Sequence, residues 1–321
     1  MRTSMPFVLL SVLSVIAVSG CTGQVNTGNG VVIEEFTPGF TEIYPGEPVV
    51  FYLKFRNAGS VDATNVFAEV LGLDEDWALS SSGIDGNRIL RGEVLPRESL
   101  CQYDRTEHHT LMAPDMTYGT EGESATCTWM YRAPGIPEGM KPEYPITARV
   151  FYDYRTDVVK SFTLAPAGEM LSYSQQGRAL PAGTVSSTRS PISISVESRS
   201  PIRFWDNGDV SFPVAITVSN KGGGMACLRD HCKKASSGGH EWNQVLLRIT
   251  PAGDGLSVSE ECEGFTGSGG ILEVWPGRDN TIICNIVAGS LDSIVGHEER
   301  MIGISAEYGY FTDSHASITI L

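Results

Sequence analysis

Several features that would identify an enzyme are missing from this sequence. It has no Gly-x-Ser-x-Gly nucleophile elbow and no phosphate-binding glycine loop ahead of a helix. His240-Glu241 and His297-Glu298 could each begin a zinc-hydrolase motif, but neither pair is followed by the required second histidine. We therefore expect no catalytic residues, no enzyme activity and no cofactor.

Helical patterning and positive charge are also scarce. Apolar residues do not recur with a helical period over any sustained run, which argues against a helical domain or a two-lobed α/β binding protein. Lysine and arginine number 23 against 38 aspartate and glutamate, so the net charge is −15. Such an acidic chain is not expected to bind nucleic acid or anionic lipid.

The N-terminus indicates export. Arg2 precedes an apolar run from Pro6 to Val18, which is too short to span a bilayer. The following Val18-Ser-Gly-Cys21 resembles a lipobox, which implies a signal peptide over residues 1–20 and a lipid on Cys21. An ordinary secretory signal cut nearby is the alternative.

The residues after the signal are small and polar, so we expect residues 21–30 to be a flexible tether. With lipid on Cys21, the protein would be attached to the outer face of the cytoplasmic membrane. In a cell with a second membrane, it would lie in the periplasm or on the outer membrane.

The rest of the chain predicts an all-β fold. Short runs with period-2 alternation are separated by Gly, Pro and Asn, which is typical of β-sandwiches. We expect two tandem immunoglobulin-like sandwiches, at residues 31–166 and 191–321, with residues 167–190 as a linker. The expected strands are 31–36, 49–56, 64–71, 125–131, 146–154 and 158–164, then 192–196, 210–219, 244–250, 271–275, 281–287, 301–311 and 314–320.

The two halves repeat each other. The strand that ends at Asn57-Ala-Gly59 matches the strand that ends at Asn220-Lys-Gly222. The last two strands of each half, expected to form a hairpin, match at one constant offset: Tyr152, Tyr154, Thr156 and Asp157 correspond to Tyr308, Tyr310, Thr312 and Asp313. We conclude that one domain occurs twice.

The cysteines fit this repeat. Cys127 and Cys284 occupy equivalent strands, so their expected partners are Cys101 and Cys262, each within its own half. Cys227 and Cys232 then remain to pair with each other. Together with His231 and His240 they could instead bind zinc, but an exported chain favours the disulfide, and we expect no metal.

A strand ending in Asn-x-Gly, followed by the alternating strand Ala63–Val70, resembles the opening of CARDB-type immunoglobulin-like modules. These modules occur in tandem on surface proteins of bacteria and archaea. The resemblance implies a sandwich of adhesive or spacer type, without catalysis. An insertion at Gly223–Trp242 departs from a minimal module, and binding residues concentrate on such loops.

The insertion is therefore the expected binding loop, with His231, His240 and Trp242 as its candidate residues. We expect a lipid-anchored adhesion, scaffold or envelope-interaction protein whose partner is a surface protein or a glycan. A solute- or glycan-binding lipoprotein of an uptake system is the alternative. Self-association by β-strand addition of Val31–Phe36 is a further expectation.

Overall fold

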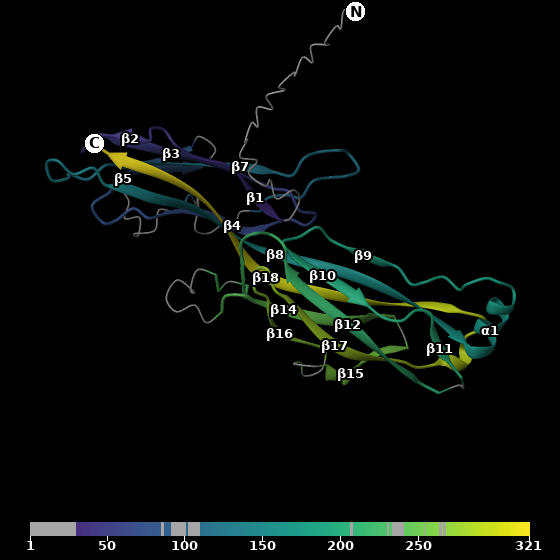
Figure 1. The fold of residues 1–321 in the computed structure, drawn as a ribbon. Coiled ribbons are helices and arrows are strands. Elements are labelled where there is room, and N and C mark those ends of the chain that lie inside the picture. Colours follow the sequence, from purple (N-terminus) through teal and green to yellow (C-terminus); the bar gives the residue numbers. More distant parts are fainter. Residues whose placement is uncertain are drawn as a thin grey trace, which may run out of the picture.

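The computed structural model describes residues 30–84, 87–90, 101, 110–205, 208–229, 231–232, 241–253, 255–262, 265 and 268–321. Its described residues form an all-β sandwich fold, as predicted, with one α-helix, α1 (Ala167–Gln175), and a 3-10 turn, η2 (Leu291–Ser293). The molecule is elongated, with a sandwich toward each end (Figure 1).

The first sandwich has a five-stranded sheet of its own, in the order β1-β3-β7-β5-β6. Alternation in β3 buries Val49, Phe51, Leu53 and Phe55 in the core, where Trp129 of β7 is fully buried. The bounds of these strands are Val31–Pro38, Pro48–Asn57, Ser124–Arg132, Ala78–Ile84 and Asn87–Leu90.

The second sandwich has a four-stranded sheet of its own, in the order β10-β12-β17-β15. Strand β12 repeats the alternation of β3 and buries Phe212, Val214, Ile216 and Val218. The bounds of these strands are Ile192–Glu197, Val210–Asn220, Asp279–Ala288 and Leu256–Cys262.

A third sheet runs through both sandwiches, and we call it the shared sheet. Its centre is the antiparallel pair β8 (Glu143–Pro166) and β18 (Glu298–Ile320), which stay in register from Glu143 opposite Thr319 to Leu164 opposite Glu298. The flanking strands are β2 (Glu42–Ile43), β4 (Thr64–Leu71), β9 (Val185–Ser187), β11 (Ile202–Phe204), β13 (Met225–Cys227), β14 (Gln244–Ala252) and β16 (Gly269–Glu273).

The two predicted hairpins do not form. Residues 146–154 and 158–164 belong to one continuous strand, β8, and residues 301–311 and 314–320 belong to β18. The alternation that predicted two strands continues through residues 155–157, so nothing in the pattern requires a turn there. Each long strand instead pairs with its counterpart from the other half.

Each sandwich consequently contains a strand segment from the other half of the chain. The end of β18 pairs with β2 beside the first sandwich, through Ile320 and Ile43. The end of β8 pairs with β11 beside the second, through Leu164 and Ile202. The division predicted at residues 166 and 191 therefore does not separate two self-contained domains, because they exchange their last strands.

The predicted linker, residues 167–190, is also structured. It contains α1 at the far end of the second sandwich and β9, which pairs with β8 through Val158–Lys160 (Figure 1). Residues 167–190 thus lie along the second sandwich rather than between two domains.

The two halves of the chain are related by an approximate two-fold axis that passes through one residue pair of the β8–β18 register. The offset that relates Tyr152 to Tyr308 is 156 residues, and the same offset relates Asp153 to Gly309. Asp153 and Gly309 also face each other in the β8–β18 register. Exchanging the two halves therefore maps this pair onto itself, and we call this position the centre.

Candidate binding surface at the centre of the shared sheet

Four tyrosines line the inner face of the shared sheet at the centre. Tyr152 lies opposite Tyr310, and Tyr154 lies opposite Tyr308, all in edge-to-face or tilted ring contacts at centroid distances of 5.6 to 6.4 Å. All four are buried. Since the chain supplies two from each half, this aromatic core joins the sandwiches.

Two of these tyrosines form hydrogen bonds to the Asn-x-Gly turns that end β3 and β12. The Tyr310 hydroxyl donates to Asn220 Oδ1 at 2.7 Å and accepts from the Gly224 N–H at 2.9 Å. Asn220 Oδ1 also accepts from the Gly222 N–H, and its Nδ2 donates to the Gly224 carbonyl. One asparagine side chain thus ends β12 and closes the turn.

The first half repeats this arrangement with Asn57 and Tyr154. Tyr154 Oη lies 3.5 Å from Asn57 Oδ1 and accepts from the Val61 N–H at 3.2 Å. The glycine is needed because the tyrosine ring approaches the backbone closely. A Cβ at Gly59 would collide with Tyr154 Oη, and one at Gly222 would lie 2.6 Å from Tyr310 Oη.

Burial governs the acid–base behaviour of these tyrosines. Burial raises the pKa of Tyr154 to about 12, and the hydrogen bond from Val61 opposes that rise. Burial also raises the pKa of Tyr152, Tyr308 and Tyr310. All four therefore remain neutral over the physiological pH range.

The predicted binding loop begins on the opposite, outer face of the centre. Its first strand, β13, pairs with β18, and Cys227 lies opposite Gly309. The Cys227–Cys232 disulfide covers this glycine, since a Cβ there would lie 2.7 Å from Cys232 Sγ and 3.2 Å from Cys227 Sγ. Gly309 is therefore required by the disulfide above it.

The register shows how long the insertion is. In the first half Thr64 and Phe67 pair with Asp153 and Phe151, with a β-bulge between them. The equivalent partners in the second half, Gly309 and Glu307, pair with Cys227 and Leu246. The second interval is 19 residues against 3 in the first, so 16 residues are inserted where the first half has a bulge.

An aromatic cluster lies beside the disulfide. Phe67 stacks on Phe151 at 4.4 Å, Phe151 contacts Phe311 at 5.5 Å, and Trp242 meets the Phe311 ring edge-to-face at 5.5 Å. The Arg149 guanidinium lies 4.1 Å from the Phe311 centroid and makes two 2.7 Å hydrogen bonds to the Asp313 carboxylate.

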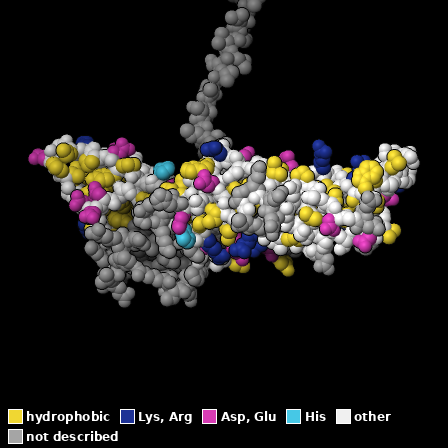
Figure 2. Space-filling view, turned by 90° about the horizontal axis from the view of Figure 1, so that it is seen from below, with side chains coloured by type: hydrophobic (Ala, Val, Ile, Leu, Met, Phe, Trp, Pro, Cys, Tyr) yellow, Lys and Arg dark blue, Asp and Glu magenta, His cyan; other side chains and the backbone are white. Residues whose placement is uncertain are grey.

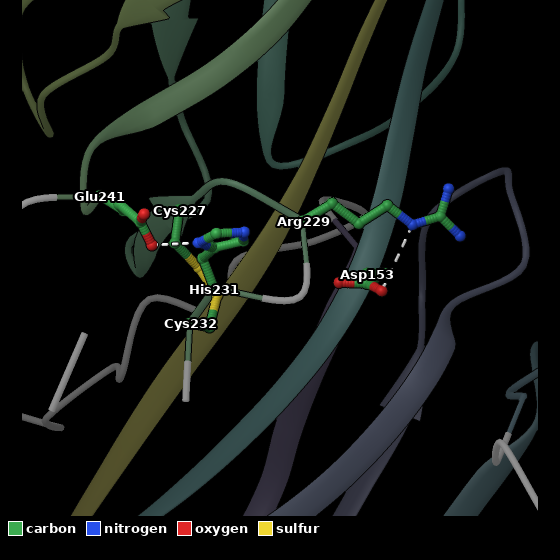
Figure 3. Close-up of a disulfide and its surroundings, with 6 residues drawn as sticks. All are labelled: Asp153, Cys227, Arg229, His231, Cys232 and Glu241. Carbon is green, nitrogen blue, oxygen red and sulfur yellow. Dashed lines mark hydrogen bonds and ion pairs between the residues drawn. A yellow bond between two sulfur atoms is a disulfide. The ribbon is translucent and has the colours of Figure 1, made fainter. Parts of the chain in front are cut away.

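Charged side chains of the insertion lie on both sides of the disulfide, Arg229 on one and Glu241 on the other (Figure 3). Arg229 reaches back to the buried centre, where its Nε lies 3.5 Å from Asp153 Oδ2, and Asn65 Nδ2 donates to the same oxygen. His231 Nδ1 contacts the Glu241 carboxylate. The Arg229 contact fastens the start of the insertion to β8, and the His231 contact joins the start of the insertion to its end.

The structure places the predicted site residues as follows. The disulfides Cys101–Cys127, Cys227–Cys232 and Cys262–Cys284 are present as predicted. Trp242 is half-buried against Phe311. Cys21 and His240 lie outside the described residues.

Among the described residues, no three His, Cys, Asp or Glu side chains gather as metal ligands would, and no helix is long and apolar enough to cross a membrane. Val31–Phe36, the segment expected to add to another chain, pairs with β3, and its exchange between chains stays a prediction.

Sequence reasoning missed Asp153, Gly309 and the joining role of the tyrosines. The signal was present in the constant offset between the tyrosine pairs, but that offset does not reveal that the two segments lie against each other. The tyrosines were used only to align the halves.

Comparison with known proteins gives no family. No protein-family model matches the chain, and no curated protein matches it. Among solved structures, AvmM, titled as catalysing macrocyclization in alchivemycin A biosynthesis, is 17% identical over 39% of this chain and 74% of its own, with a TM-score of 0.23. The secreted serine protease VesC from Vibrio cholerae is 9% identical over 87% and 50%, with a TM-score of 0.20. Likenesses this distant carry no functional argument.

Proposed function

We propose that this protein is an exported, lipid-anchored surface protein without catalytic activity, which acts as an adhesion, scaffold or envelope-interaction module. The observation that carries the proposal is the β8–β18 pair, which joins both sandwiches without a flexible connection. A structural module of this kind holds its binding surfaces at a defined separation.

The stiffness of this arrangement follows from its hydrogen bonding. Strand β8 has 24 residues and therefore extends for about 80 Å at about 3.3 Å per residue. Bending the molecule at its centre requires breaking ladder hydrogen bonds and separating four buried tyrosine rings. Ordinary interdomain linkers impose no such cost, which is why tandem domains usually move relative to each other.

The proposal also includes export and the anchor on Cys21, which rest on the N-terminal sequence. The Val18-Ser-Gly-Cys21 box and the preceding apolar run support them. In this account the cell-surface partner is a protein or a glycan.

Cross-linking on intact cells followed by mass spectrometry tests this role. We expect repeated recovery of the same chain or of one envelope protein. Recovery of transporter subunits in its place would contradict the adhesion or scaffold function and favour an uptake system.

A solute- or glycan-binding function is the second candidate, favoured by two buried polar atoms at the end of the insertion. Trp242 Nε1 and Asn243 Oδ1 have no hydrogen-bond partner within the described part of the chain. A polar ligand could supply both partners. A Trp242→Phe variant keeps the ring against Phe311 and removes the donor, so reduced binding on an oligosaccharide array would support this function.

A further inference from the structure

The chain enters the fold at its centre rather than at either tip. Gly30, the first described residue, accepts a hydrogen bond from the Ala58 N–H at 2.8 Å. A Cβ at Gly30 would lie 2.7 Å from the hydroxyl of Tyr152, one of the central tyrosines, and 2.9 Å from Pro191. Any anchor that precedes Gly30 therefore attaches to the middle of the molecule (Figure 1).

A loop with exposed apolar side chains lies next to this entry point. The loop comprises residues 111–120, and we call it the waist loop. Met112, Met116 and Tyr118 are 56, 77 and 83% exposed. Three large apolar side chains are therefore exposed within seven residues of one loop, which sets the loop apart from a surface with singly scattered apolar residues.

Contacts connect the waist loop to the entry point. The turn that follows Ala58 exchanges hydrogen bonds with Arg189, since Ser60 N donates to the Arg189 carbonyl at 3.0 Å and Arg189 N donates to Ser60 Oγ at 2.7 Å. The Arg189 guanidinium then lies 3.9 Å from Met116 Sδ. Contacts thus lead from Gly30 through the turn after Ala58 to Arg189 and Met116, so the waist loop lies close to the entry point.

The waist loop has a defined conformation that holds these side chains outward. Asp115 Oδ1 accepts hydrogen bonds from the N–H groups of Thr117 and Tyr118 at 2.8 and 3.3 Å. Asp62 Oδ1 accepts from Ala113 N at 2.7 Å, and Leu111 exchanges backbone hydrogen bonds with Ala63. The apolar side chains therefore project from a fixed loop and are available to a partner.

The length of the tether indicates that this partner is the membrane. Gly30 follows Cys21 by nine positions, with eight residues between them, and a chain of that length spans at most about 30 Å. If Cys21 carries lipid, as the proposed function requires, Gly30 lies within that distance of the bilayer, and the waist loop lies beside it.

We infer that the waist loop docks on the membrane surface, with Met116 and Tyr118 entering the headgroup region. Tyrosine favours this interface because its ring is apolar and its hydroxyl remains hydrated. The carboxylates of Asp115 and Glu121 are balanced by Arg189, which lies beside Met116, and by Arg56, which pairs with Glu121. The surface therefore has no excess of positive charge to attract anionic lipid, and it suits a zwitterionic bilayer. Both sandwiches then extend along the membrane.

Spin labels on the full-length lipidated chain in phosphatidylcholine vesicles test this inference. Six cysteines are in disulfides and Cys21 carries the lipid, so Tyr118→Cys introduces one free thiol. Val295→Cys is the matched control, because Val295 is an apolar residue that is 97% exposed at the far end of the second sandwich.

We expect the label at position 118 to lose accessibility to a water-soluble nickel reagent and to gain accessibility to oxygen, while the label at 295 remains accessible to nickel. Equal accessibility of both labels on an anchored chain overturns the docking inference alone. Absence of lipid on Cys21 by mass spectrometry, with no chain bound to vesicles, overturns both the docking and the proposed anchor.

Discussion

Tyr154 and Tyr310 each place a hydroxyl against an asparagine amide at the end of a strand. The asparagine side chain then forms hydrogen bonds to the backbone groups of the turn. These side-chain hydrogen bonds replace the backbone hydrogen bonds between strands, which stop where the strand ends. Because the network is buried, an unpaired member would retain the full cost of its desolvation. These two residues therefore contribute to stability more than their packing alone suggests.

The geometry predicts different costs for removing the two hydroxyls. Tyr310→Phe leaves the Gly224 N–H without its partner and removes the 2.7 Å bond to Asn220, so we expect it to lower the free energy of unfolding by about 1–3 kcal/mol. Tyr154→Phe removes the longer bonds to Asn57 and Val61 and should cost less. Urea denaturation measures both, and Tyr118→Phe, an exposed tyrosine, is the control. Equal costs for Tyr310 and Tyr118 would contradict this network.

Burial of tyrosine also predicts the alkaline limit of stability. The folded pKa of Tyr154 is about 12, above the value of about 10 in an unfolded chain. The contribution of Tyr154 to the free energy of unfolding is therefore complete below pH ~10 and is lost as the pH rises toward 12. Over this range the tyrosine is ionised in the unfolded chain but still neutral in the folded one. The free energy of unfolding measured from pH 8 to 12 should fall, and should fall less steeply in Tyr154→Phe. An identical slope in that variant would contradict this assignment.

At the scale of elements, β8 and β18 have different surroundings on the two faces of the sheet at the centre. The inner face is aromatic, and the outer face is covered by the disulfide and by the ends of the insertion. The 16 inserted residues begin where the first half has a bulge, a place at which the ladder is already interrupted. An insertion there adds a loop without disturbing the pairing of β8 with β18.

Gly309 should be sensitive to substitution for this reason. Gly309→Ala would place a methyl group against both sulfur atoms of the disulfide, and such overpacking typically costs about 1–3 kcal/mol. Gly303→Ala in the same strand is the control, since its Cβ would meet only the Thr250 carbonyl at 3.6 Å. Thermal unfolding of the two variants measures the difference. A Gly309→Ala protein as stable as Gly303→Ala would contradict the placement of the disulfide.

Several elements could be predicted from the sequence because their signals are local. Alternation predicted β3, β4, β7 and β12, and the repeat predicted the three disulfides. The continuity of β8 could not be predicted, since a hairpin and an exchanged strand bury the same residues and differ only at residues 155–157. The burial of Trp242 was also hidden, because it depends on Phe311, which is distant in the sequence.

At the scale of the whole molecule, the exchange of strands turns two sandwiches into one elongated body (Figure 2). The connection between the halves is a hydrogen-bonded sheet with a buried aromatic core, while residues 167–190 lie along one side. The distance between the two ends should then have a single value.

Pulsed electron resonance between labels at the two ends measures that distance. Phe40→Cys and Val295→Cys place labels at exposed apolar positions in different sandwiches. We expect one narrow distance distribution that is unchanged by ionic strength, since the joint is a sheet rather than a charged interface. A broad distribution, typical of domains on a flexible linker, would contradict the rigid joint.

Cleavage of the chain after Gly177 tests the exchange of strands most directly. Gly177 follows α1 and is exposed, and each of the three disulfides lies within one half of the chain, so only noncovalent contacts would hold the fragments together. A protease site introduced there should give two fragments that elute as one particle in gel filtration and separate only in denaturant. Separation into two folded fragments without denaturant would contradict the shared strand pair.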